Sequence, residues 1–423
     1  MINKMNDINV RKFVTFPLCL LMVLPGIACI STLILQDTKA AYYYFLYFLL
    51  GDSCLLLGGI FVCQSLMRKE SIEISEKIGA LFLTWALVCV LFAKDQYLAF
   101  YGADYRMEGY LGILIYASFY LCGAYLTNSR QKRILLDWFL YSSVPVTFVF
   151  WCQKLRVFRV FLNLEKNVYL IMGQYDSGVF QHHNHYGYYL TMVILCAATT
   201  AVFSKKKKRT IVYSFVFLCN GFALAANDTM GGILAVVVGL LVFIVLIGKR
   251  NRELLIVSVV PLVTFICILL IYNSTSHSMT NNYQSMVKDI GQITKAENID
   301  SIGTGRGRLW KQAVMYIKDH PIVGYGPDGL GELYQRDGFV QDRPANEYLQ
   351  YIGFFGIPGL FLYLGFISSI GFPRLKILKQ LSDIQMIVGV CIIGYLCSAF
   401  FGNSVYNTTS YLFLFLGFLK SEV

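Results

Sequence analysis

Apolar residues along this chain come in runs of about twenty, separated by short charged clusters. A run of that length crosses a hydrocarbon core about 30 Å thick as a helix. The pattern therefore predicts an all-α, polytopic membrane protein with about 12 transmembrane helices. The predicted spans are 13–35, 41–66, 78–94, 109–127, 134–152, 185–204, 210–226, 229–248, 251–273, 347–370, 384–401 and 405–419.

The segments between these spans alternate in charge. One set is short and rich in Lys and Arg, as at Arg68-Lys69 and Lys205 to Arg209. Such loops are cytoplasmic in most membrane proteins. The alternation places both termini in the cytoplasm and the other set of loops outside. The predicted outer loops are 36–40, 95–108, 153–184, 227–228, 274–346 and 402–404.

The alternation divides the chain into three parts. Residues 1–273 hold transmembrane helices 1–9, residues 274–346 form one large extracytoplasmic loop, and residues 347–423 hold helices 10–12. A net charge of +11 raises the question of nucleic-acid binding, but the Lys and Arg lie mainly between apolar spans. All twelve Cys fall within or beside apolar runs, which disfavours a disulfide framework or a Cys-based metal site.

The large loop contains an amphipathic helix that ends near His320-Pro321, because the residue before proline is disfavoured in a helix. Its apolar stripe consists of Leu309, Trp310, Ala313, Val314 and Ile317. Arg306 shares this stripe, whereas Arg308 points elsewhere. An inward arginine needs an anionic partner, which is a substrate phosphate in one interpretation and an acidic side chain or a lipid headgroup in the other. The glycines at 303, 305 and 307 do not form a P-loop.

Three further polar groups are candidates for chemistry. Where the loop enters the span at 347, polar residues at membrane depth indicate function, although Asn346 fits a helix cap equally well. At the mouth of the sixth span, three histidines lie close together without an acidic or Cys partner, so we expect no metal there. The charged residues at 106–108 fit either an internal ion pair or a contact with the substrate. The residues in question are Arg343, Asn346 and Glu347; His182, His183, Asn184 and His185; and Arg106 and Glu108.

Together these segments resemble the O-antigen ligase and polymerase family of bacterial envelope proteins, over roughly residues 100–420. The loop motif of that family is similar to Gly305-Arg306 with Trp310, followed by His320-Pro321, Gly324 and Gly326. Its H-N-x-x-L segment is similar to Asn346-Glu347-Tyr348-Leu349, with Gly353 and Gly356 after it. Its paired-asparagine segment resembles Phe180 to Asn184, with His182 at the first asparagine.

Two departures from the family pattern bear on activity. Ala345 stands where the family has the histidine that is assigned to activating the acceptor, and Thr229-Met230 stands where the family has a Ser-Arg pair. Ala345 is either natural, with lost or altered chemistry, or a substitution that inactivates the enzyme. The intact motif around it favours the substitution. We therefore predict that the chain as written is inactive or nearly so.

The resemblance implies a GT-C-like fold in the bacterial cytoplasmic (inner) membrane, with the active site on the outer face. It implies transfer of a glycan from a polyprenyl-diphosphate donor, such as an undecaprenyl diphosphate, to an acceptor hydroxyl on a glycan, lipid, teichoic-type polymer or protein. We expect inversion at the anomeric carbon and no cofactor or metal. The expected catalytic positions are Ala345, Arg306, Asn346 and Glu347, and the expected substrate-binding residues are Arg308, Arg106, Arg343, His182, Asn184 and His320.

A transporter or flippase of the same lipid-linked oligosaccharides is the alternative. Its cavity would also hold arginines, but it would not need a long outer loop with its own helix. Inverted repeats would be expected in many such transporters, and the sequence shows none.

Overall fold

The computed structural model describes residues 14–29, 41–69, 71–103, 106–126, 128–155, 177–180, 182–277, 280, 284 and 302–421. These residues form helices and turns and contain no strand. Eight helices are long and apolar enough to cross a membrane, and three shorter apolar helices accompany them within the described ranges. An all-α polytopic membrane protein is therefore confirmed, while the count of twelve spans stays a prediction. The predicted loop 36–40 and most of 153–184 lie outside the described residues.

Each predicted span coincides with a helix. The helices are Val14–Cys29, α2 (Ala41–Met67), α3 (Ile74–Leu91), α5 (Tyr110–Tyr125), α6 (Ser129–Lys154), α8 (His183–Phe203), α9 (Lys207–Asn227), α10 (Met230–Arg250), α11 (Leu255–Ser276), α15 (Glu347–Lys376), α16 (Asp383–Ala399) and α17 (Tyr406–Lys420). The expected tight turn between α9 and α10 is confirmed, with Asp228 in the left-handed conformation at φ 61°.

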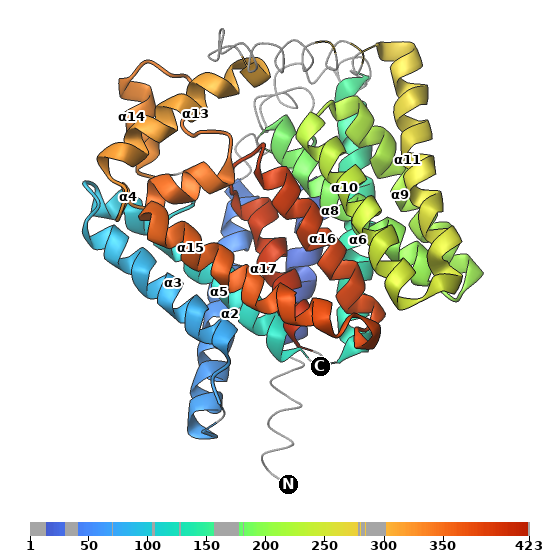
Figure 1. The fold of residues 1–423 in the computed structure, drawn as a ribbon, viewed down its shortest axis with the longest axis horizontal. Coiled ribbons are helices and arrows are strands. Elements are labelled where there is room, and N and C mark those ends of the chain that lie inside the picture. The colour runs from blue at the N-terminus through green and yellow to red at the C-terminus, as the bar shows by residue number, and fades with distance from the viewer. Residues whose placement is uncertain are drawn as a thin grey trace.

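Two helices form the centre of the bundle. In α8, 94% of the most apolar 18-residue window is buried, and in α17 every residue from Tyr406 to Leu419 is buried. The corresponding fractions are 33% for α2, 28% for α3 and 22% for α11, so these helices lie at the periphery. Figure 1 shows α17 and α16 in the middle of the molecule, with α2, α3 and α5 to one side and α9, α10 and α11 to the other.

The basic ends of several helices meet at one end of the bundle, which we call the basic end. Arg250 at the end of α10 pairs with Asp383 at the start of α16, at 3.0 Å. Arg374, near the end of α15, donates to the carbonyl oxygen of Lys420 in α17 at 2.7 Å, and Lys420 lies 3.7 Å from Glu73 before α3. The loops predicted to be cytoplasmic at these positions therefore share one end.

The opposite end carries the helices of the large loop, and we call it the loop end. Here α13 (Ile302–Asp319) and α14 (Leu330–Arg336) lie above the start of α15 (Figure 1). The predicted amphipathic helix is confirmed, including its stop before His320. Its buried face holds Leu309 and Ala313, but Val314 is 42% exposed and Tyr316 is buried instead, which corrects the predicted stripe. The helix α14 was not predicted.

Helix α15 is broken at Gly356, whose φ of 69° is left-handed. The break frees backbone groups, and these find partners outside the helix. Tyr325 and Gly326 of the loop donate their N–H groups to the carbonyl oxygens of Gly353 and Phe354 at 2.8 and 3.0 Å. A Cβ at Gly356 would collide with the carbonyl oxygen of Ile322. The loop and the first half of α15 are thus one hydrogen-bonded unit, which positions the loop residues that follow.

Candidate functional site

Asp328 joins three segments at the loop end. Its carboxylate accepts the backbone N–H groups of Ala103, at 2.9 Å, and Glu108, at 3.2 Å. The same carboxylate forms an ion pair with Arg343. Asp328 is 5% exposed and has a φ of 57°, a conformation that Asp adopts more readily than most residues. The turn before α5, the turn before α14 and the segment before α15 are therefore fixed relative to one another.

Arg343 is committed to this internal network. Besides its pair with Asp328, it donates to the carbonyl oxygen of Ser404 at 3.3 Å, and its guanidinium lies 5.6 Å from the centre of the Phe354 ring. Its side chain is 3% exposed. The Ser404 hydroxyl in turn donates to Glu108 at 2.6 Å. Burial raises the pKa of Glu108. The geometry gives Arg343 a positioning role within the protein, and substrate binding by it stays a prediction.

Arg106 also has a carboxylate partner. It bonds both oxygens of Asp342 in the two-pronged geometry of a guanidinium–carboxylate pair, at 2.8 and 3.0 Å. Its third contact is with Nε2 of His185, at 3.5 Å. Much of its charge is therefore balanced by Asp342.

Arg306 differs from these two arginines. It is half-buried in α13, directly after Gly305, and no carboxylate pairs with it among the described residues. Burial is the main cause of the lowered pKa of His182, and the positive charge of Arg306 contributes to it after His183 and Arg106. A half-buried guanidinium without a carboxylate favours an anionic partner. Arg306 thus lacks the internal counter-charge that Arg106 and Arg343 have, and phosphate binding by it stays a prediction.

Two predicted residues lie away from this group. Arg308 is exposed, and its guanidinium stacks over the ring of Phe339 at 4.5 Å. His320 is exposed at the far end of α13, 4.5 Å from the Tyr325 ring and about 20 Å along the helix from Arg306. Substrate binding by either residue stays a prediction.

The first turn of α8 brings histidines to the same place. His182 caps the helix, and its Nδ1 accepts the N–H of Asn184 at 3.1 Å. The His182 and His183 rings are 4.2 Å apart. Thr229, within the predicted Ser-Arg position, donates to the carbonyl oxygen of His183 at 3.4 Å. The segment that lacks the family arginine therefore lies against this helix start.

At the start of α15, Asn346 caps the helix by accepting the N–H of Leu349 at 3.0 Å, as the capping interpretation expected. Glu347 is buried inside the bundle and accepts the hydroxyl hydrogens of Tyr363 and Tyr395, each at 2.8 Å. These contacts explain why polar residues are tolerated at this depth. A catalytic role for either residue stays a prediction.

Ala345 has a left-handed backbone, with φ at 51°. Positive φ is uncommon for residues other than glycine, and Asn, Asp and His are enriched in it several-fold. The residue is half-buried between the buried Pro344 and Asn346. Position 345 therefore suits a histidine better than an alanine on backbone grounds alone.

Sequence reasoning did not single out Asp328 and Ser404. Asp328 lies in the turn Gly326-Pro327-Asp328-Gly329, which is a weak indication of a structural role. The sequence did not indicate that Arg343 is its partner. Ser404 lies in a short loop without any motif. The described residues contain no group of three or more His, Cys, Asp or Glu side chains arranged to hold a metal.

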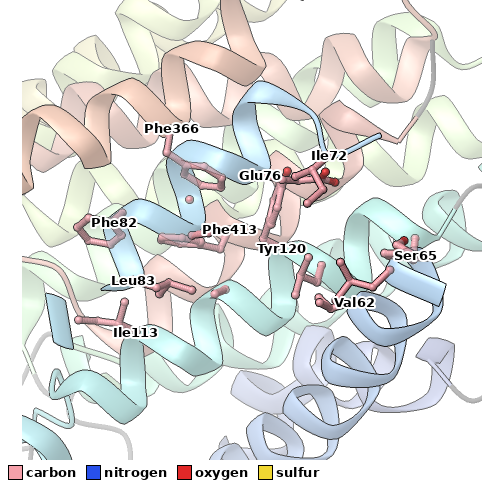
Figure 2. Close-up of a pocket in the computed structure, with 16 residues that line it drawn as sticks. Val62, Ser65, Ile72, Glu76, Phe82, Leu83, Ile113, Tyr120, Phe366 and Phe413 are labelled. Carbon is pink, nitrogen blue, oxygen red and sulfur yellow. The ribbon is translucent and has the colours of Figure 1, made fainter. Parts of the chain in front are cut away.

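Two cavities lie elsewhere in the bundle. One of about 260 Å³ is lined by apolar residues of α2, α3, α5, α15 and α17, with Glu76 and Ser65 toward one end (Figure 2). Another of about 220 Å³ lies beside α15, α16 and α17. Neither is lined by Arg306, His182 or Ala345, so the chemistry is assigned from the charged residues of the loop end.

The arrangement at the loop end can bind an anion and hold it without using the paired arginines. Arg306 offers charge and two-pronged hydrogen bonds, and the start of α8 offers imidazole groups and the positive end of a helix. Such donors stabilise a diphosphate leaving group, whose charge grows as its bond to a sugar breaks.

Comparison with known proteins gives one family. Residues 215–364 match the family model described as O-antigen ligase. These residues include α10, α11, α13, α14 and the first part of α15. A search of curated proteins found no match. The match confirms the resemblance seen in the sequence and supports membership of this chain in the O-antigen ligase family.

Proposed function

We propose that this protein transfers a glycan from a polyprenyl-diphosphate donor to an acceptor hydroxyl at the outer face of the bacterial cytoplasmic membrane, as a polysaccharide ligase or polymerase. The family match supports glycan transfer of this general type. The loop end, with α13 and α14, is the outer face in this proposal. The donor class, the inversion and the orientation go beyond the match.

Arg306 carries the proposal. It is half-buried and has no carboxylate partner among the described residues, whereas Arg308, which also lacks one, is exposed and stacks over Phe339. A guanidinium can contact two diphosphate oxygens at once, which a lysine cannot do. In the transition state the leaving diphosphate gains charge, and Arg306 would stabilise it more strongly than in the ground state.

The acceptor hydroxyl needs a group that takes its proton. In the family, a histidine at position 345 is assigned this role, and here Ala345 can neither accept a proton nor form a side-chain hydrogen bond. Arg306 is unaffected by that change. We therefore propose that the chain as written binds its donor but transfers slowly or not at all.

Donor binding tests this proposal without requiring turnover. The purified chain, Arg306→Ala and Arg306→Lys are titrated with a defined polyprenyl-diphosphate-linked oligosaccharide. The matched control is Lys318→Ala, which removes one exposed positive charge from the same helix. We expect loss of affinity by about tenfold or more in Arg306→Ala, partial rescue in Arg306→Lys and no change in the control. Equal affinity in Arg306→Ala and the unsubstituted chain contradicts the proposal.

A further inference from the structure

His182 is held in one tautomer by its position at the start of α8. Its Nδ1 accepts the backbone N–H of Asn184 at 3.1 Å. A ring nitrogen that accepts this hydrogen bond carries no hydrogen of its own, so in the neutral imidazole the hydrogen is on Nε2. The cap therefore both orients the ring and leaves Nε2 as a donor. This assignment follows from the hydrogen-bond geometry.

The surroundings of His182 keep the ring uncharged. Its pKa is lowered to about 4, mainly by burial and then by His183 and the positive charges of Arg106 and Arg306, while Asp342 acts in the opposite direction. His185, in the same turn, has its ring 5.7 Å away. At neutral pH the residue is thus a neutral hydrogen-bond donor.

We propose that His182 donates a hydrogen bond from Nε2 to the diphosphate of the glycan donor, beside Arg306. This inference rests on the proposed function and deepens it. The helices that carry Arg306 and His182 meet the same turn. Trp310, one turn after Arg306 in α13, has its ring 5.7 Å from that of Phe400, and Tyr188 in α8 donates to the carbonyl oxygen of Phe401 at 2.6 Å. An anion bound to Arg306 would therefore lie toward the start of α8. A hydrogen bond from an N–H group to an anion is stronger than one to a neutral acceptor. Because the neutral imidazole keeps its N–H group as the pH rises, this contribution to anion binding does not depend on protonation of the ring.

A second imidazole in the same turn supports an anionic ligand here. Arg106 lies 3.5 Å from Nε2 of His185, and a guanidinium only donates, so Nε2 accepts and Nδ1 carries the hydrogen. That Nδ1 is buried and has no hydrogen-bond partner among the described residues. A buried donor without an acceptor is costly, which favours an acceptor-rich ligand at this helix end.

The inference also accounts for a histidine at the first position of the paired-asparagine segment. An asparagine there has a side-chain oxygen for the cap and an N–H₂ group for a ligand. The imidazole of His182 supplies the same two functions from its two nitrogens. Since the lone pair of Nδ1 is used by the cap, His182 is not a substitute for the base that is missing at Ala345.

Serine and asparagine substitutions separate the cap from the donor. Both His182→Asn and His182→Ser keep a capping oxygen, but only asparagine has a second polar atom that can donate beyond the cap, because the serine hydroxyl is itself the capping group. Affinity for a polyprenyl-diphosphate-linked oligosaccharide and the melting temperature are measured for both. We expect His182→Asn to bind within about threefold of the unsubstituted chain. His182→Ser should melt at the same temperature but bind about 10- to 100-fold more weakly. The exposed His277→Asn serves as control.

The outcomes distinguish this inference from the function on which it rests. If His182→Ser binds as tightly as the unsubstituted chain, or His182→Asn as weakly as His182→Ser, the donor role of Nε2 is overturned. Weak binding by Arg306→Ala in the same experiment then leaves the proposed function standing. Normal binding by both His182→Ser and Arg306→Ala would overturn the diphosphate site itself.

Discussion

Arg343 and Asp328 form an ion pair whose side chains are 3% and 1% exposed, where the loop end meets α15. Because Asp328 also accepts two backbone N–H groups near α5, the pair fixes the segment that carries Ala345. The position of the catalytic candidate thus depends on a charge buried two residues before it.

Removing one partner of this pair should destabilise the protein strongly. In Asp328→Asn, Arg343 remains buried with only the longer pair to Asp342, at 3.7 Å. Losing the close counter-charge costs about 3–5 kcal/mol in comparable sites. The matched control is Asp383→Asn, which breaks the pair with Arg250, where the Asp side chain is 40% exposed. There we expect a loss of about 0–1 kcal/mol. The melting temperatures of both variants are measured by thermal unfolding in detergent. Similar melting temperatures would show that the buried pair does not hold these segments together.

The helices were predictable because membrane spans are long and apolar, and because buried backbone must be hydrogen-bonded within each helix. The break at Gly356 was not, because it depends on contacts with Tyr325 and Gly326, some thirty residues earlier. The stripe of α13 was partly wrong for a similar reason. Tyr316 is buried because its hydroxyl reaches Leu333 in α14 and Asp337 just after that helix, which sequence reasoning did not predict.

The sequence supplied candidate residues for the site but not the contacts among them. The sequence made Arg306 a catalytic candidate and Arg106 and Arg343 substrate-binding candidates, but it did not show which of them have internal partners. The structure separates them, because Asp342 and Asp328 pair with two of them. That pairing is long-range, since Arg106 and Asp342 are 236 residues apart, and no local pattern encodes it. The left-handed backbone at Ala345 was likewise invisible in the sequence.

The orientation of the loop end is tested by cysteine labelling of intact cells. Val340 is 94% exposed in the large loop, and Lys206 lies in the basic loop between α8 and α9. A membrane-impermeant thiol reagent should label Val340→Cys and spare Lys206→Cys. The unsubstituted chain gives the background from its twelve native cysteines. Labelling of Lys206→Cys with protection of Val340→Cys would reverse the topology.

His182 should give stability a specific pH dependence. An unfolded histidine has a pKa of about 6.5, whereas the folded environment of His182 lowers its pKa to about 4. Between these values the unfolded chain binds the proton, so the free energy of unfolding decreases as the pH falls from about 6.5 to about 4. His182→Asn removes this contribution. Its melting temperature should therefore rise relative to that of the unsubstituted chain between pH 7.5 and pH 5. If the difference in melting temperature between the two proteins is the same at both pH values, the pKa of His182 is not lowered.

Transfer should not require a divalent metal, because Arg306 supplies the charge that stabilises the leaving diphosphate. In an active chain, EDTA should leave the rate of product formation unchanged. The comparison is the same reaction with added magnesium or manganese. Activity that stops with EDTA and returns with either ion would refute this prediction.

The central claim is that Ala345 occupies the position of the group that activates the acceptor. The left-handed φ of 51° suits histidine, so Ala345→His should fold as well as the unsubstituted chain. An imidazole at this position has an ordinary pKa near 6.5 and can accept the proton of the attacking hydroxyl. Such assistance is worth about 10²–10⁴-fold in rate.

The most direct measurement is product formation by the purified chain and by Ala345→His, with the same polyprenyl-diphosphate-linked donor, the same acceptor and equal amounts of folded protein. We predict that Ala345→His transfers the glycan about 10²–10⁴-fold faster, with donor affinity unchanged. Equal rates in the two proteins would contradict the account, because acceptor activation would then not depend on residue 345.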